Sequence, residues 1–545
     1  MSNFELQRFL STYYVYLLEF NFFFLIIAVI LNYKYIEEIF VRIGKKSLLL
    51  LILISISGAA LASLVTPQNH RVYYDEDIYS SIGQCIAHHK RAVMCNEGYH
   101  EHGEFKIVAE EYNKQPAAYP YLISIIYRIF GTNELFIFIF NNIIFALSAI
   151  VIFLISFLFF ESIFAGLIAS LSYIFIPVNL QWFNTCAIEP STTFFASLSV
   201  LALLIYIRNK KPINLFFFIC ALAFSFNFRP ESLLIVTVVG LILLLKDIKI
   251  FARKELYFFG VLLFLLSLGI VVHLYAMQGN NWGATGAKFS MEYFNRNFGT
   301  NTAFYFNNKG FPVVFSILAI IGLLFYKSKV YVKEKVILLS WFLAFWGIFL
   351  FFYAGTYEHD LGLSTRFSIL SYVPISICIG LGASLIKNLL IVRVKYIKQI
   401  LVILIIFGAS SFLPFVRSQS KAESAACRMD HKYAMEFVKQ LPEDSIIFTH
   451  NPSMFLINKR SAIQTSSETY NPGTVKRCLM QFRGGVYVHF NYWSGVSYDQ
   501  LQRSFTQNIL DRYDYEILEE HYYKNYKYGL YKITDLKMRK VIERK

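Results

Sequence analysis

Apolar segments of roughly 16–25 residues recur along this chain of 545 residues, and they restrict its fold more than any other feature. A run of about 20 apolar residues is long enough to cross the hydrocarbon core of a bilayer as a helix. Hydrophobic residues make up 56% of the chain and charged residues only 16%, a balance that soluble globular proteins do not have. The sequence therefore predicts a polytopic α-helical membrane protein.

About twelve membrane spans are expected, and the basic residues of the connecting loops support this count. Basic clusters at 34–46, 208–211, 246–254, 327–335 and 387–398 all fall on one side of the membrane if the spans alternate. The positive-inside rule makes that side cytoplasmic, so the net charge of +15 indicates topology and not nucleic-acid binding. The approximate limits of the spans are 14–33, 47–65, 134–159, 161–178, 187–207, 213–228, 230–245, 256–275, 312–326, 336–354, 367–386 and 397–416.

Three segments then face outward, and the division of the chain into domains follows from them. They are residues 66–133, residues 276–311 and everything after about 417. Residues 417–545 are expected to form a small extracytoplasmic α/β domain. Its helices are predicted at Asp430–Leu441 and Tyr498–Ile509, and its strands at Ser445–Thr449, Val486–Phe490 and Tyr528–Ile533.

The remaining residues form the membrane part of the chain. Residues 47–416 are expected to make one membrane domain, whose external loop 66–133 ends in an interfacial or re-entrant helix at Ala117–Phe130. Residues 1–46 add a leading transmembrane helix and a cytoplasmic loop. This N-terminal stretch lacks the basic segment and the small-residue cleavage site of a signal peptide.

Three adjacent carboxylates, Asp75, Glu76 and Asp77, follow the second span directly. Acidic residues beside a bilayer often mark sites that handle protons or ions. We expect Asp75 to be a general base, because a low-dielectric boundary and a neighbouring acid both raise the pKa of a carboxyl group. Two alternatives stay open, a solvated acidic loop and a D-x-D metal element in which Asp75 and Asp77 bind a divalent cation.

Three cations are predicted on the outer side, where the positive-inside rule disfavours them. Arg229 interrupts two apolar stretches, Arg366 begins the eleventh span, and Lys114 precedes Gln115-Pro116. Arginine at such a boundary suits bidentate binding of a phosphate, although pairing of Arg229 with Glu231 is an equally simple explanation. Glu189, at the start of the fifth span, is either an acceptor contact or an acid favoured by the helix dipole.

Cysteine and histidine residues give weaker signals. An extracytoplasmic setting permits disulfides, so Cys85 with Cys95 and Cys427 with Cys478 are candidate pairs whose bonding the sequence does not decide. The loop also contains four histidines whose spacing matches no closed zinc site, and we expect them to be surface residues; they are His88, His89, His100 and His102.

Four motifs in order resemble one family. Asp75-Glu76-Asp77-Ile78-Tyr79 resembles the D-E-x-x-Y element of GT-C membrane glycosyltransferases, in particular the protein O-mannosyltransferases and lipid A aminoarabinose transferases. The segment from Gln115 to Leu122, followed by Phe130-Gly131, is similar to the family's K-P-P-L-Y-P-Y-L and F-G. Phe228-Arg229-Pro230-Glu231 resembles T-R-P-E, and Thr365-Arg366-Phe367 resembles a later R-Y element. The chain departs from the family pattern in two ways. Gln115 and Ala117 replace the Lys and the second Pro of K-P-P, and the leading span lies outside the pattern.

The resemblance implies a GT-C fold and the transfer of a sugar from a polyprenyl-phosphate donor to an extracytoplasmic lipid, glycan or protein. By position, Asp75 would be the base and Glu76 would orient the acceptor or a cation. The cations Arg229, Arg366 and Lys114 would neutralise the leaving phosphate. Glu189, Tyr79 and Gln115 would contact the acceptor or substrate. No metal or other cofactor is implied, with a divalent cation as the alternative. The positive-inside pattern favours a bacterial inner membrane, with an archaeal membrane or the endoplasmic reticulum as the alternatives.

Two other classes of function are compatible with the composition. Twelve spans suit a transporter or a flippase for lipid-linked sugars, but the sequence contains no visible two-fold repeat and its acids and cations gather at one face. A non-catalytic assembly or receptor protein would use the C-terminal domain as its binding module.

Overall fold

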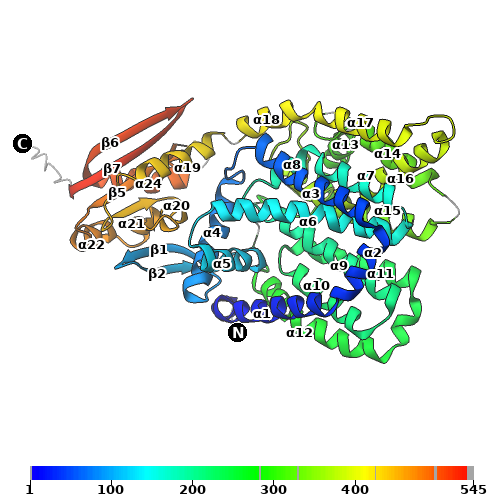
Figure 1. Ribbon diagram of the computed structural model, residues 1–545. Coiled ribbons are helices and arrows are strands. Elements are labelled where there is room, and N and C mark those ends of the chain that lie inside the picture. Colours follow the sequence, from blue (N-terminus) through cyan, green and yellow to red (C-terminus); the bar gives the residue numbers. More distant parts are fainter. Residues whose placement is uncertain are drawn as a thin grey trace, which may run out of the picture. The chain divides into compact units, whose positions relative to one another are not determined.

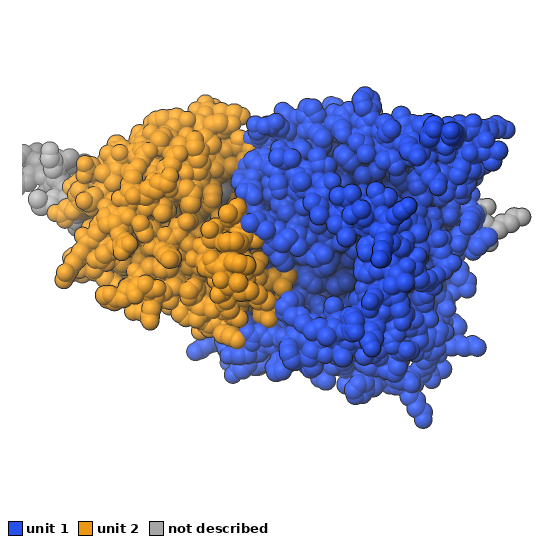
Figure 2. All heavy atoms as spheres, in the orientation of Figure 1, with its two compact units in different colours: residues 1–69, 114–119, 137–423 blue, residues 70–113, 120–136, 424–545 orange. Residues whose placement is uncertain are grey.

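The computed structural model describes residues 3–280, 284–307, 309–327, 330–423, 425–495 and 500–536. Figure 1 shows these residues as many helices and one group of strands. The chain divides into two compact units (Figure 2). Unit 1 comprises residues 1–69, 114–119 and 137–423, and unit 2 comprises residues 70–113, 120–136 and 424–545.

Unit 1 is built from helices. In chain order they are α1 (Asn3–Leu31), α2 (Tyr33–Ile43), α3 (Lys45–Val65), α6 (Leu135–Phe160), α7 (Ile163–Ile174), α8 (Pro177–Trp182), α9 (Glu189–Asn209), α10 (Pro212–Phe226), α11 (Ile235–Lys246), α12 (Lys254–Ala276), α13 (Phe294–Phe304), α14 (Val313–Phe325), α15 (Val332–Ile348), α16 (Tyr372–Leu390), α17 (Ile397–Ser410) and α18 (Leu413–Ala422). Four 3₁₀ helices lie between them: η1 (Pro230–Leu234), η2 (Ile248–Ala252), η3 (Met291–Tyr293) and η4 (Leu363–Ser371).

Each of the predicted spans coincides with one or more of these helices. In the described residues, seven helical segments are long and apolar enough to cross a membrane, namely α1, α3, α6, α9, α12, η4–α16 and α17–α18. The other predicted spans fall on α7, α10, α11, α14 and α15, which have 12, 15, 12, 13 and 17 residues. The predicted fold class, a polytopic helical membrane protein with an α/β segment, is confirmed.

Glycines allow the helices of unit 1 to approach one another closely, as small residues do in membrane proteins. A Cβ atom added to Gly382 of α16 would lie 2.0 Å from the carbonyl oxygen of Leu318 in α14. One added to Gly322 of α14 would lie 2.1 Å from the carbonyl oxygen of Cys378. Gly380, which like Gly382 is on α16, approaches the backbone of Ala165 in α7 in the same way. The backbone of α16 is therefore in direct contact with two neighbouring helices.

Unit 2 contains the strands, joined in one seven-stranded sheet of order β2-β1-β4-β3-β5-β7-β6. The central strands β4, β3 and β5 are parallel, and the outer pairs are antiparallel. The strands are β1 (Met94–Glu101), β2 (Glu104–Glu111), β3 (Ile446–Thr449), β4 (Ser461–Gln464), β5 (Val486–Phe490), β6 (Tyr513–Tyr523) and β7 (Tyr526–Leu536). The helices are α4 (Tyr73–His89), α5 (Ala118–Phe130, whose first two residues belong to unit 1), α19 (Ala425–Val438), α20 (Ser453–Leu456), α21 (Ser466–Tyr470), α22 (Thr474–Gln481), α23 (Tyr492–Gly495) and α24 (Gln500–Arg512).

Helices cover both faces of the sheet. Alternate residues of β3 belong to two separate apolar cores: Ile447 packs with α4, α19 and α20, whereas Ile446 and Phe448 pack with α22 and α24. Most strands and helices predicted after residue 417 coincide with observed ones; only residues 498 and 499 of the predicted helix Tyr498–Ile509 lie outside the described residues. The hairpin β1–β2, from the first predicted external loop, was not expected to join this sheet.

None of the seven cysteines forms a disulfide bond. The candidate pair Cys427 with Cys478 is wrong, because Cys427 packs against one core of unit 2 and Cys478 belongs to the core on the other face of the sheet. Cys85 and Cys95 do share a core and lie close together, but they are not bonded either.

Close packing at α16 generates a stability prediction. Gly382→Val places side-chain atoms against the backbone of α14, and we expect it to lower the free energy of unfolding by about 3 kcal/mol, as overpacking of a core does. Gly408→Val on α17 is the matched control, because a Cβ atom there has nothing within 4 Å. Thermal unfolding of both variants in detergent micelles measures the difference. Equal losses of stability would contradict the close approach of α14 and α16.

Candidate active site

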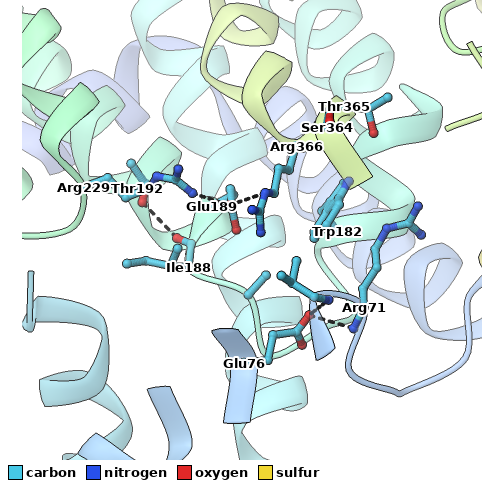
Figure 3. A network of polar contacts seen from close by, with 12 residues as sticks. Arg71, Glu76, Trp182, Ile188, Glu189, Thr192, Arg229, Ser364, Thr365 and Arg366 are labelled. Carbon is cyan, nitrogen blue, oxygen red and sulfur yellow. Dashed lines mark hydrogen bonds and ion pairs between the residues drawn. The ribbon is translucent and has the colours of Figure 1, made fainter. Parts of the chain in front are cut away.

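The helix α4 begins with the acidic motif, and Glu76 holds the start of this helix. One oxygen of its carboxylate, Oε1, accepts hydrogen bonds of 2.7 Å from the backbone N–H groups of both Arg71 and Val72 (Figure 3). Backbone N–H groups at the start of a helix have no hydrogen-bond acceptor within the helix itself. Since Glu76 is fully buried, its observed contacts are with the chain itself, and its predicted role toward an acceptor stays a prediction.

The other two carboxylates of the motif lie in different surroundings. Asp77 is fully buried; its Oδ2 accepts a hydrogen bond of 2.8 Å from Asn451 and its Oδ1 lies 3.0 Å from Nδ1 of His70. Asp75 is partly exposed. Positions i and i+2 of a helix do not face each other, so the structure does not bring Asp75 and Asp77 together as a D-x-D pair. Tyr79, one turn after Asp75, is buried.

In unit 1, the predicted cations Arg229 and Arg366 meet at Glu189 (Figure 3). Arg229 donates to Glu189 and forms an ion pair of 2.6 Å with Glu231, while Nε of Arg366 lies 3.6 Å from Glu189. The guanidinium groups of both arginines lie over the ring of Phe367, at 5.5 and 5.1 Å from its centroid. Two segments predicted independently are thus adjacent in space. We call Glu189, Arg229, Glu231 and Arg366 the arginine cluster.

The arginine cluster is buried and electrically balanced. The side chains of Glu189, Arg229 and Glu231 are 6%, 8% and 11% exposed, and that of Arg366 is 19% exposed. Two positive and two negative charges compensate each other, which a buried charge requires. The alternative prediction, that Arg229 pairs with Glu231, is confirmed. Arg366 is the more exposed of the two arginines and has the longer contact with Glu189, so its guanidinium group is the better placed to meet an anion.

The hairpin that carries Arg229 is held by two other segments. Its first residue, Asn227, follows the end of α10 and accepts hydrogen bonds from the Ala118 N–H at 3.0 Å and from the Tyr14 hydroxyl at 2.8 Å. Pro230 then starts η1, since proline favours the first turn of a helix. The motif around Gln115 therefore lies against the motif of Arg229, and the leading helix α1 supports both.

The residues before α5 occupy a buried corner of unit 1. The Lys114 carbonyl oxygen lies 3.2 Å from the Nε2 atom of His273, and the Lys114 side chain is half-buried. The side-chain oxygen of Gln115 is buried, and no described residue donates a hydrogen bond to it. It is therefore an acceptor that a hydroxyl group of a ligand is able to satisfy.

Sequence reasoning missed Asn141, which holds the segment that leads to Glu189. Its buried amide donates to the Tyr119 hydroxyl at 3.0 Å and to the carbonyl oxygens of Thr185 and Ala187 at 2.7 and 3.1 Å. The signal was present in the sequence as Asn141-Asn142, two amides inside the apolar span α6. Polar residues inside a span usually face the protein and hydrogen-bond there.

An apolar cavity of about 360 Å³ lies between α13, α14, α15 and α16. Its walls are aromatic and aliphatic side chains, among them Phe342, Trp346 and Ile375. One wall residue, Tyr305, is linked by its hydroxyl to Ser371 at 3.0 Å, at the end of the 3₁₀ helix η4 that carries Arg366. The cavity has the size and apolar lining of a site for a hydrocarbon ligand.

Glu189 generates a prediction about stability. Glu189→Gln leaves two buried guanidinium groups with less compensation, and we expect a loss of about 3 kcal/mol in the free energy of unfolding. Glu161→Gln is the control, because Glu161 also lies near two arginines, Arg42 at 3.6 Å and Arg208 at 3.8 Å, but its side chain is 63% exposed. The control should change by less than about 1 kcal/mol. Denaturant unfolding in micelles compares them, and similar losses would show that the arginine cluster is not effectively buried.

The comparisons with known proteins agree with this architecture. Residues 114–275 match the family model for dolichyl-phosphate-mannose-protein mannosyltransferase. The structure is similar to ArnT from Cupriavidus metallidurans bound to undecaprenyl phosphate, with a TM-score of 0.57 and 10% identity over 88% of this chain and 97% of that chain. It is also similar to ArnT in the apo state, with a TM-score of 0.53, 9% identity and the same coverage.

A third solved structure, the Archaeoglobus fulgidus oligosaccharyltransferase tethered to an acceptor peptide, matches with a TM-score of 0.47 and 12% identity over 90% of this chain and 74% of that chain. No curated protein matches the sequence. At such low identity the likeness to ArnT shows the fold. Together with the family match, it confirms the predicted resemblance of this chain to the glycosyltransferases of the GT-C fold.

Proposed function

We propose that this membrane protein transfers a sugar from a polyprenyl-phosphate donor to a hydroxyl group of an extracytoplasmic acceptor, with Asp75 as the general base. The observation that carries the proposal is the different use of three adjacent carboxylates. Glu76 and Asp77 are fully buried and hydrogen-bonded by the chain, whereas Asp75 keeps part of its surface exposed at the start of α4. A base must be accessible to the proton that it removes.

The proposed step is an inverting displacement. Asp75 takes the proton of the acceptor hydroxyl while its oxygen attacks the anomeric carbon of the donor sugar. The bond between that carbon and the phosphate oxygen breaks, and the polyprenyl phosphate leaves with the electron pair. Arg366, supported by Arg229 and Lys114, would stabilise the charge that develops on the phosphate. No metal ion takes part in the proposed step.

Two features of unit 1 support a lipid-linked donor. The apolar cavity between α13, α14, α15 and α16 suits part of a prenyl chain, and η4 connects its wall to Arg366. The similarly folded ArnT was solved bound to undecaprenyl phosphate, which is a ligand of this chemical class. The unsatisfied Gln115 oxygen suits a hydroxyl of the sugar, and Glu189 and Tyr79 remain candidate contacts.

The proposal includes the membrane in which the protein lies and the orientation of its loops. The basic loops between the predicted spans favour an inner membrane of bacterial type, with the acid motif and the C-terminal segment on the extracytoplasmic side. The acceptor would be a lipid, a glycan or a protein of the cell envelope.

The base assignment is tested by one substitution. Asp75→Asn removes the proton acceptor with little change in shape, and we expect turnover to fall about 100-fold or more. Purified protein is given lipid-linked sugars, and the release of free polyprenyl phosphate is measured. Asp514→Asn, on the exposed part of β6, is the control and should leave turnover unchanged. Unchanged turnover in Asp75→Asn would remove the base, and no turnover of any donor by the wild type would favour a transporter.

The phosphate assignment is tested at Arg366. Arg366→Gln should raise the KM for the donor about tenfold, because a charged hydrogen bond to the phosphate is lost, and should leave the KM for the acceptor nearly unchanged. Arg208→Gln, at an exposed ion pair with Glu161, is the control. An equal effect on donor and acceptor would sink the assignment. Arg229→Ala should also weaken donor binding, but its two carboxylate partners make this variant less stable as well.

A further inference from the structure

Unit 2 contains a compact group of metal-ligating side chains that the proposed transfer does not use. Nε2 of His70 lies 3.1 Å from Oε1 of Glu134, and Nε2 of His431 lies 3.6 Å from Oε2 of the same carboxylate. Ligand atoms from the three residues all lie within 4.8 Å of one another. The side chains are 2%, 13% and 22% exposed. We call His70, Glu134 and His431 the histidine–glutamate cluster.

The cluster has the surroundings of a metal site. Asp77 lies 3.0 Å from Nδ1 of His70, on the opposite side of the ring from Glu134. A carboxylate in this position is typical of metal-binding histidines, because it fixes the ring and leaves the other nitrogen for the metal. Asn451 in turn donates to Asp77 at 2.8 Å, and Ser80 donates to Glu134 at 2.9 Å. The carboxylates of Asp77 and Glu134 are thus each held by a further hydrogen bond.

The distances suit a small divalent cation. In a tetrahedral zinc site with bonds of about 2.0–2.1 Å, two ligand atoms are about 3.3 Å apart. Nε2 of His70 lies 3.1 Å from one oxygen of Glu134 and Nε2 of His431 lies 3.6 Å from the other, and both separations are close to this value.

We propose that the histidine–glutamate cluster binds one divalent transition-metal cation, with zinc as the expected ion. Two imidazoles and one carboxylate are a donor set for zinc or ferrous iron, whereas magnesium and calcium prefer oxygen ligands alone. His70, Glu134 and His431 are the ligands, and Asp77 is a positioning residue that acts through His70. The site differs from the D-x-D alternative, because Asp75 takes no part and Asp77 does not touch the ion.

Such an ion would join three segments that are far apart in the sequence. His70 precedes α4, Glu134 lies between α5 and α6, and His431 lies on α19. The ion would therefore fix the start of α4, where Asp75 lies, against the C-terminal segment. The binding of the ion does not depend on the proposed sugar transfer, and its test needs no substrate.

The experiment uses the full-length protein in detergent micelles. Metal analysis of the purified protein should find one equivalent of zinc or another first-row transition metal per chain. After removal of the metal with a chelator, added Zn²⁺ should raise the unfolding temperature, and added Co²⁺ should give the visible absorption of a four- or five-coordinate site with nitrogen and oxygen ligands. His431→Ala should weaken Zn²⁺ binding at least 100-fold, and Asp77→Asn about 10- to 100-fold.

His521→Ala is the matched control. His521 lies near Glu436 and Glu519 in a second group of ligand atoms in unit 2, which is more exposed, and this variant should retain its metal. Loss of metal in His521→Ala but not in His431→Ala would assign the ion to that second group and overturn the proposal. A folded wild type that binds neither Zn²⁺ nor Co²⁺ stoichiometrically would show that the cluster is an ion-pair network only. The Co²⁺ spectrum of the wild type decides this even if His431→Ala fails to fold.

Discussion

Compensation of buried charge is the constraint on which the arrangement of unit 1 depends. Arg229 and Arg366 come from hairpins 137 positions apart, and each carries a charge that cannot be buried alone. Glu189 meets both, and the segment before it is fixed by Asn141, which also holds Tyr119. The charges of Glu189, Arg229 and Arg366 thus hold three segments together.

The acidic motif follows the same principle with a different result. Three carboxylates in succession on one helix point in three directions, and each meets a different environment. Glu76 satisfies backbone groups at the start of α4, Asp77 faces His70 and Asn451, and Asp75 retains contact with solvent. The side chains of the three residues are chemically nearly the same, and their environments differ because of their positions on the helix.

Local patterns made much of the fold predictable. Apolar runs located the spans because burial in lipid demands length and composition, and alternating β-branched residues located β3 and β5. The motifs around Arg229 and Arg366 were also recognisable, and the pairing of Arg229 with Glu231 was among the predicted alternatives. These features share one property: the residues that define them are neighbours in the sequence.

Contacts between residues that are far apart in the sequence were not predictable in the same way. The residues around His70 and His431 do not indicate that these two histidines, 361 positions apart, belong to one cluster. The residues around Glu134 do not indicate that it joins them either. The role of Asn141 was visible only as an unexplained amide in an apolar span. The hairpin β1–β2 reads as part of a loop, because its strands become part of a sheet only when β4 pairs with β1.

The pairing of β1 with β4 has a consequence for how the chain is threaded through the bilayer. Hydrogen-bonded strands occupy the same compartment, so the number of crossings between residues 111 and 424 must be even. Of the seven long apolar helices in the described residues, five lie in this interval: α6, α9, α12, η4–α16 and α17–α18. If all five cross the bilayer, an odd number of the shorter helices in this interval, α5, α7, α10, α11, α14 and α15, crosses as well. The pairing of β1 with β4 outside the bilayer thus decides whether the number of crossing segments between them is even or odd.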